Sequence, residues 1–230
     1  MTAPAASIAG RAPPRRALII ACGALVREIK AVLGQSRLGA IDLRALPAGL
    51  HTRPREIAPA VARQLAETAG TYQQVFVAEG AWGTGGQLAR GRAAHGAERL
   101  PGALCYEVFA GLEAFEARAD RDLTSLCLSD GLARQFVALV VRGLGLDRHP
   151  ELRDVYFAHY ERVVYLSQAP TDTLVDKARA AARFLDLDFE HRHVGYGDLG
   201  ACLETLFPRA FEVPPAGYRV PTINTATKEV

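Results

Sequence analysis

The chain has 230 residues, of which 49% are hydrophobic and 23% are charged, a composition typical of a folded globular protein. Its 27 basic and 25 acidic residues are interspersed and leave a net charge of +2, which excludes the strongly basic surface that binds nucleic acid or anionic membranes. The apolar stretch at 17–25 is far shorter than the roughly 20 residues of a membrane span, so we expect a cytoplasmic protein.

Pro, Ala and Arg dominate residues 1–15, which predicts a disordered N-terminal tail. After it, apolar runs alternate with segments of helical periodicity. The predicted strands of this half lie at 17–22, 40–47, 73–80 and, as a short one, 98–102; the predicted helices lie at 24–33, 54–69, 86–96 and 106–120.

The second half continues the same alternation. Its elements, in chain order, are a strand at 123–128, a helix capped by Ser129 or Asp130, a helix with Pro150 in its first turn, a strand at 162–168, a helix capped by Thr171 or Asp172, a strand at 188–195 and a last helix capped by Asp198. We expect 208–230 to form an irregular C-terminal tail.

This alternation predicts one three-layer α/β domain over 16–207. Its mostly parallel sheet should contain about six or seven strands, with helices on both faces. Right-handed crossovers place the loops that follow parallel strands at one edge of a sheet, where α/β proteins bind ligands. We therefore expect the functional site in the loops after the first four strands.

A glycine-rich segment, EGAWGTGGQLARG (79–91), follows the third strand directly. It is either a ligand-cradling loop or only a tight turn, because glycine suits both and helix N-termini attract anions. Its spacing matches neither the dinucleotide fingerprint nor the phosphate loop. Trp82 is either a core residue or a stacking surface for a planar ligand. The candidate ligand-binding residues of this loop are Trp82, Gly83, Thr84, Gly85 and Gly86.

Two side chains at the expected edge are candidates for catalysis, Cys105 and Glu79. Cys105 is either a buried packing residue or, at the start of a helix, a nucleophile with a lowered pKa. Glu79 ends the third strand and is well placed for acid–base chemistry. His51, in the loop after the second strand, either binds ligand or bonds only to backbone. The other candidate ligand-binding residues near this edge are Cys22, Glu28, His51 and Tyr106.

Two further sets of polar residues lie away from the sheet edge at which we expect the site. His191 and His193 alternate on one strand, as expected of a chance pair on a solvated face. The polar and aromatic segment 150–160 is expected either to line a cleft or to dock a partner. The four cysteines are widely spaced and lack a CxxC pair, which indicates reduced thiols rather than a disulfide framework.

Several stretches together carry a family resemblance: IACGALVREI, ALPAGLHTRP, the GTGG loop, CYEVFAG, LARQFVALVVRGLGLDRHPELRDVYFAHYERVVYLSQ and GYGDL. In that order they resemble the bacterial and archaeal family catalogued as domain of unknown function 1638, over about residues 17–205. The resemblance implies a protein that accompanies corrinoid-dependent methyltransferase systems, which demethylate methylated amines and betaines.

The resemblance also implies a metal-binding pattern, from which this chain departs. The family pattern has a cysteine just before the loop glycines and a His–Cys pair after the next strand, a set suited to zinc or another soft metal. Here Trp82 and Leu104 stand at two of those positions, and only Cys105 matches. We therefore expect no metal.

Two functions follow from the sequence and the resemblance. The first is a protein that binds a small molecule or a corrinoid-bearing methyltransferase partner in one-carbon (methyl-transfer) metabolism of methylated amines or betaines, with a catalytic role at Cys105. Its cofactor would be a corrinoid supplied by that partner. The second is a non-catalytic binding or assembly module that has lost the family's Cys/His metal site. Whether the protein is an enzyme stays open at this stage.

Overall fold

The computed structural model describes residues 17–37, 41–80, 84, 86–93, 95–99 and 105–207. Both predicted tails lie outside these ranges. So do four residues singled out in the sequence: Trp82, Gly83, Gly85 and Leu104.

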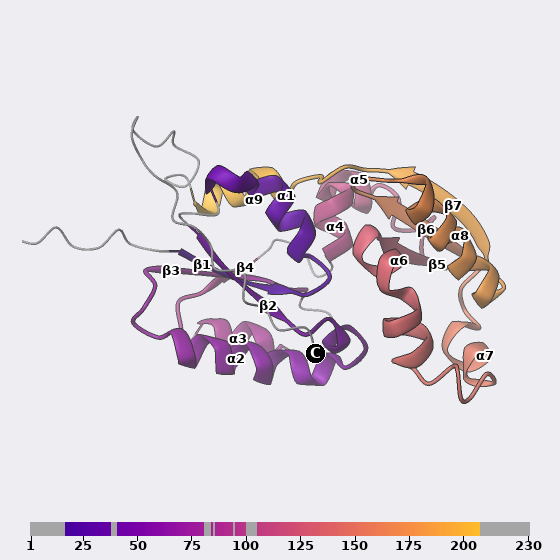
Figure 1. Ribbon diagram of the computed structural model, residues 1–230, viewed down its shortest axis with the longest axis horizontal. Coiled ribbons are helices and arrows are strands. Elements are labelled where there is room, and N and C mark those ends of the chain that lie inside the picture. Colours follow the sequence, from indigo (N-terminus) through magenta and orange to yellow (C-terminus); the bar gives the residue numbers. More distant parts are fainter. Residues whose placement is uncertain are drawn as a thin grey trace, which may run out of the picture.

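The predicted α/β class with parallel strands is confirmed, but the seven strands of the described ranges form two sheets instead of one (Figure 1). The first sheet has the order β2-β1-β3-β4 and the second the order β5-β6-β7, and all neighbouring strands are parallel. The strands are β1 (Ala17–Cys22), β2 (Ile41–Leu46), β3 (Gln74–Ala78), β4 (Glu98–Arg99), β5 (Ser125–Ser129), β6 (Arg162–Ser167) and β7 (Asp188–His193).

The edge strand β4 explains why the first sheet ends where it does. It contains only Glu98 and Arg99, which pair with Phe76 and Val77 of β3. So short a strand offers little edge for another strand to extend. The chain then forms the short helices α4 (Cys105–Ala110) and α5 (Leu112–Glu116) before β5 begins the second sheet.

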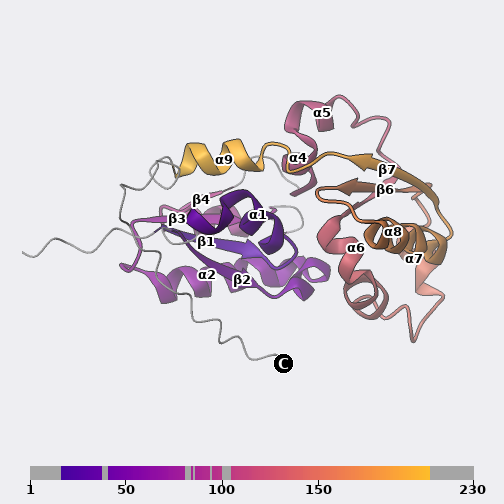
Figure 2. The same cartoon turned by 45° about the horizontal axis from the view of Figure 1, so that its top comes forward.

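Helices cover both faces of the first sheet and complete what we call the first lobe. Ile19 and Ala21 of β1 belong to the core shared with α1 (Val26–Arg37) and α9 (Leu199–Leu206), while Leu18 and Ile20 belong to the core shared with α2 (Ile57–Thr68) and α3 (Gln87–Ala93). Figure 2 shows α9 beside α1, so the chain returns to the first lobe after building the second. The predicted three layers are thus present around this sheet.

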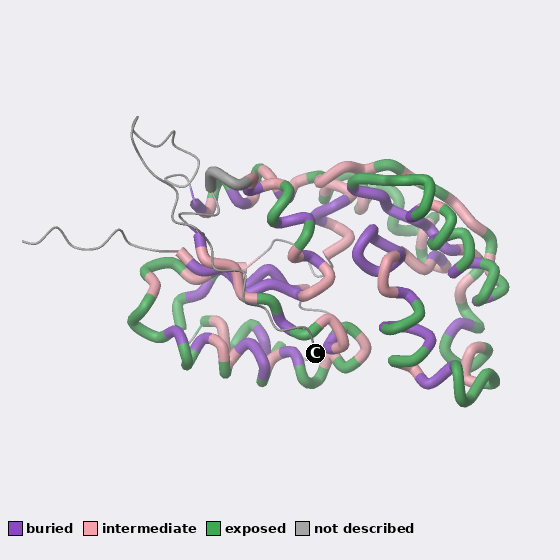
Figure 3. The backbone as a smooth tube through the Cα atoms, viewed as in Figure 1, coloured by how far each residue is buried: buried purple, intermediate pink, exposed green. Residues whose placement is uncertain are grey.

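The second lobe consists of the second sheet with α6 (Asp130–Phe136), the π-helical segment η3 (Val137–Arg142), α7 (Leu152–Phe157) and α8 (Asp172–Leu185). Val163 and Tyr165 of β6 are fully buried in the core that these helices share. The central strands β1 and β6 are mainly buried, whereas the helices of both lobes alternate between buried and exposed positions (Figure 3). No helix in the described ranges is long and apolar enough to cross a membrane.

Local signals from the sequence decided several helix ends. The Ser129 and Thr171 side chains cap α6 and α8, accepting hydrogen bonds from Leu132 and Leu174. Asp198 precedes α9 but does not cap it through its side chain. Its carboxylate instead accepts a bond of 2.8 Å from the Leu112 amide at the start of α5. The continuous helix predicted for 106–120 is wrong, because Gly111, with φ at +81°, separates α4 from α5.

The two lobes meet where the first helix of each begins. Gly131 of α6 lies so close to the backbone of Ala24, just after β1, that a Cβ atom on Gly131 would be 2.4 Å from the Ala24 carbonyl oxygen. Ala24 follows the carboxyl end of β1, and Gly131 follows that of β5. This contact brings the carboxyl ends of the two sheets toward each other, and the candidate site lies between them.

Candidate ligand-binding site between the two lobes

A cavity of about 570 Å³ lies between the lobes. Its wall combines the segments that follow β1, β2 and β3 with α4, α5 and all five residues of β5. Because β5 is the edge strand of the second sheet, residues on both of its faces reach the cavity. The volume lies within the range of about 300–1,000 Å³ that small-molecule sites occupy.

Five of the residues singled out in the sequence line this cavity: Cys22, His51, Glu79, Cys105 and Tyr106. Cys22 is the last residue of β1, and Glu79 directly follows β3. His51 lies in the short helical turn η1 (Ala48–Thr52) after β2, and Cys105 begins α4 after β4. Parallel strands in one sheet explain why residues so far apart in sequence gather here.

Glu28 does not line the cavity, contrary to its predicted role. It lies on α1 and is 4% exposed, and its Oε2 atom has no hydrogen-bond partner. Burial raises its pKa; Arg134 opposes that shift and Asp130 adds to it. Because both of these residues belong to α6, Glu28 lies at the contact between the lobes rather than in the cavity.

The glycine-rich segment is described only in part. Thr84 is buried at 5% exposure, and Gly86 has a φ of +74° just before α3 begins. Neither residue lines the cavity. Trp82, Gly83 and Gly85 lie outside the described ranges, so their predicted contacts with a ligand stay predictions.

Two thiols and one carboxyl converge at the end of the cavity formed by the first lobe. The side chains of Cys22 and Glu79 are hydrogen-bonded to each other. The Gly80 amide donates to the Glu79 carboxyl and also to the sulfur of Cys105. We call Cys22, Glu79 and Cys105 the polar end of the cavity.

Burial dominates the electrostatics of the polar end. It raises the pKa of Glu79 from 4.5 to about 7, against the opposing hydrogen bonds of Gly80 and Cys22. Glu79 is only 6% exposed, so its carboxylate form has lost nearly all of its hydration. At neutral pH this carboxyl is therefore close to half ionised.

The two thiols are protonated at neutral pH. Burial raises the pKa of Cys105 to about 12, Glu79 adds to the shift, and the pKa of Cys22 rises further for the same two reasons. A nucleophilic Cys105 with a lowered pKa was one interpretation of the sequence, and the lowered pKa is wrong. Two backbone N–H donors favour its thiolate, but burial outweighs them.

The opposite end of the cavity contains two residues that sequence reasoning missed as site residues, Cys127 and Ser125 of β5. Tyr160, from the segment 150–160, also lines this end. Tyr106 interacts electrostatically with Cys127, Cys105, Cys22 and Tyr160, and burial raises its pKa well above the usual value. The segment 150–160 therefore contributes to a cleft, one of its two predicted roles. No local signal in the sequence marks β5 as an edge strand.

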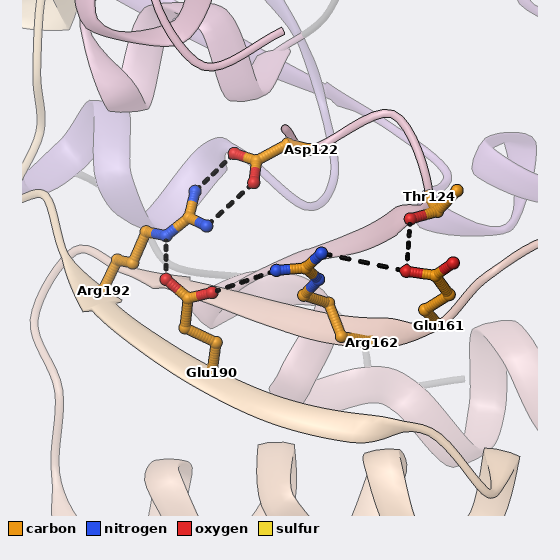
Figure 4. Close-up of polar contacts among 6 residues, drawn as sticks. All are labelled: Asp122, Thr124, Glu161, Arg162, Glu190 and Arg192. Atoms are coloured by element: carbon orange, nitrogen blue, oxygen red, sulfur yellow. Dashed lines mark hydrogen bonds and ion pairs between the residues drawn. The ribbon is translucent and has the colours of Figure 1, made fainter. Parts of the chain in front are cut away.

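A charged network supports the wall at this end (Figure 4). The Arg192 guanidinium binds both carboxylate oxygens of Asp122, and its Nε atom donates to Glu190 at 2.5 Å. Arg162 extends the network to Glu190. The Arg192 hydrogen bonds hold the pKa of Asp122 below its usual range, so Asp122 lines the cavity as a paired carboxylate. The network attaches the segment before β5 to β7.

The histidine pair of β7 has a structural partner. His191 Nε2 and His193 Nδ1 lie 2.9 and 3.2 Å from the hydroxyl of Ser167, which is completely buried. The His191 ring also stacks on Tyr165 at 5.0 Å between centroids. The pair is thus tied to the carboxyl end of β6, and neither histidine lines the cavity.

The side chains present do not fit the metal that the resemblance implied. Across the described part of the chain, no three His, Cys, Asp or Glu side chains are arranged to hold an ion. Trp82 and Leu104, at the positions of two expected ligands, offer no sulfur or imidazole donor. No chemistry at this site is therefore assigned to a metal.

The fold and the cavity define a two-lobed α/β protein with a ligand-sized site between two parallel sheets. The chain belongs to the family described as protein of unknown function (DUF1638), whose sequence model matches residues 45–203. The resemblance inferred from the sequence is thereby confirmed. No curated protein and no solved structure matches the chain significantly.

Proposed function

We propose that this protein binds a small organic molecule in the cavity between its lobes and acts in one-carbon (methyl-transfer) metabolism. The observation that carries the binding proposal is the cavity itself, which combines an apolar wall with a few convergent polar groups. Such a combination is typical of small-molecule sites, in which apolar contacts bind and polar groups orient the ligand. The metabolic setting rests on the family resemblance alone.

The protonation states of the side chains at the polar end favour ligand binding over catalysis by a thiolate. With a pKa of about 12, ionising Cys105 at neutral pH costs roughly 7 kcal/mol. Glu79, whose pKa is about 7, is the group best suited to exchange a proton with a ligand. We propose that Cys22 and Cys105 act mainly as neutral hydrogen-bonding groups around Glu79, and that a catalytic step at Cys105 requires a ligand that removes its proton.

A partner protein would either present a corrinoid to this chain or dock on its surface. A corrinoid would be presented by a methyltransferase partner, whereas the small molecule enters the cavity of this chain. The alternative function is a non-catalytic assembly module that docks its partner through α7. Val155 and Tyr156 of that helix are 69% and 48% exposed, while the neighbouring Phe157 is buried. These two exposed side chains favour the alternative.

A cavity-filling variant tests whether ligands bind between the lobes. Cys127→Phe adds a ring inside the cavity, and Cys202→Phe makes the same change at a half-buried cysteine that does not line it. Methylated amines, betaines and cobalamin are titrated into each folded protein, with binding followed by calorimetry. We expect a small-molecule ligand for the wild type and for Cys202→Phe but not for Cys127→Phe. Equal binding by all three proteins would contradict the assignment to this cavity.

A further inference from the structure

We propose that the ligand of this cavity is a small organic cation, with its ammonium group beside Glu79 and its apolar substituents against the aromatic wall. This inference rests on the proposed binding function and specifies its ligand class. It follows from the charges and rings that line the cavity.

The described cavity wall is acidic and contains no compensating cation. Its described lining contains two carboxyls, Glu79 and Asp122, and no Lys or Arg. Arg192 neutralises Asp122 from outside the lining, through a bidentate ion pair. The adjoining residues 81–83, 85 and 100–104, which the structure does not describe, contain no Lys or Arg in the sequence. Of these two carboxyls, Glu79 is thus the one whose negative charge a cationic ligand would neutralise.

The other titratable groups of the described lining do not supply a positive charge to Glu79. Cys22 from β1 and Cys105 from α4 are neutral thiols; the hydrogen bond of Cys22 lowers the pKa of Glu79, but neither thiol carries a positive charge. His51, from η1, stays partly exposed at the cavity, but the surrounding protein removes enough water to lower its pKa. Tyr106 also keeps its proton, because burial raises its pKa. Burying a carboxylate without a counter-charge is costly, so in the free protein Glu79 tends to take up a proton.

Aromatic rings make the rest of the wall suitable for an organic cation. Phe115 and Tyr106 line it from α5 and α4, and Phe157 and Tyr160, whose ring centroids lie 6.0 Å apart, line it from the second lobe. Rings attract ammonium groups through their negative faces. An anion or a zwitterion would have to bury its carboxylate without an Arg or Lys partner in the described lining. The cavity therefore favours a cationic amine over a betaine.

Binding of a cation at this position is coupled to a proton. The neutral Glu79 carboxyl releases its proton to solvent, and the ammonium group takes the proton's place as counter-charge, so charge is conserved. No covalent bond in the ligand forms or breaks. Since about one tenth of Glu79 is ionised one pH unit below its pKa, we expect affinity for a cation to be about tenfold weaker near pH 6 than near pH 8.

The test compares choline with its uncharged carbon isostere 3,3-dimethylbutan-1-ol and with glycine betaine. Calorimetry near pH 7 in two buffers of different ionisation enthalpy measures both affinity and protons released. For the wild type we expect choline to bind at least tenfold more tightly than the other two, with release of about half a proton. Titrations near pH 6 and pH 8 then measure the tenfold pH effect.

Two matched variants locate the effect. Glu79→Gln, checked for folding by its thermal unfolding, should lose most of the preference for choline over the neutral isostere, keep only the part that the rings supply, and release no proton. Glu113→Gln removes an exposed carboxyl outside the cavity and should behave as the wild type. Equal affinity of the wild type for choline and its isostere would overturn the cation proposal while leaving the binding function intact. If the wild type bound none of these three probes and none of the methylated amines, betaines or cobalamin, both the cation proposal and the proposed binding function would be overturned.

Discussion

Replacing Glu79 by glutamine is expected to change how the stability of the unliganded protein depends on pH. Burial raises the pKa of Glu79 from 4.5 to about 7 in the folded protein. The unfolded chain therefore ionises this group at a lower pH than the folded protein does. The stability that Glu79 contributes is fully present below pH 4.5 and is lost as the pH rises through 7. At ~1.36 kcal/mol for each pKa unit, the complete loss is ~3 kcal/mol.

The Glu79→Gln variant keeps nearly the same side-chain shape and removes the titration. Between about pH 5 and about pH 8.5, the free energy of unfolding of the wild type should fall by ~2.5 kcal/mol relative to the variant. Urea unfolding at constant ionic strength measures both proteins across this range. Most other groups titrate alike in the two proteins, so their contributions largely cancel in the difference. The series ends near pH 8.5, where cysteines of the unfolded chain begin to ionise.

Two results would refute this reasoning. Parallel stability curves would show that Glu79 has an ordinary pKa and is hydrated in the folded protein. If the free energy of unfolding of the wild type rose relative to the variant as the pH increased, a cationic group would be pairing with Glu79 and lowering its pKa, which would also remove the basis for a cationic ligand.

The remaining predictions concern the contact between the lobes and the buried thiols. Gly131→Ala should lower the free energy of unfolding by about 1–3 kcal/mol in urea titrations, because its methyl group would overlap the Ala24 carbonyl. Gly91→Ala is the matched control, since a Cβ atom at this helical position meets nothing within 4 Å, and it should be neutral or stabilising by up to about 1 kcal/mol. Cys105 should react with iodoacetamide at least 100-fold more slowly in the folded protein than in urea, as measured by mass spectrometry; equal rates would show an exposed, ionisable thiol.

Much of the fold could be predicted from local patterns. Apolar runs such as 17–22 and 162–168 predicted β1 and β6, because central parallel strands are buried on both faces. The hydroxyl of Thr171 marked the start of α8 for an equally local reason, because the amides of a first helical turn lack backbone partners and a capping side chain accepts a hydrogen bond from one of them. The gathering of Cys22, His51 and Glu79 also followed from the sequence, since strand-end loops share one edge of a parallel sheet.

By itself, then, the sequence determined the elements, their parallel arrangement and the half of the cavity that comes from the first lobe. Only the tertiary structure decided that the strands divide into two sheets, that β5 is an edge strand and that Arg192 neutralises Asp122 from 70 residues away. It also decided the pKa of Glu79. Strand periodicity and capping depend on near neighbours in the chain, whereas sheet edges, desolvation and charge compensation depend on what packs against a residue from elsewhere.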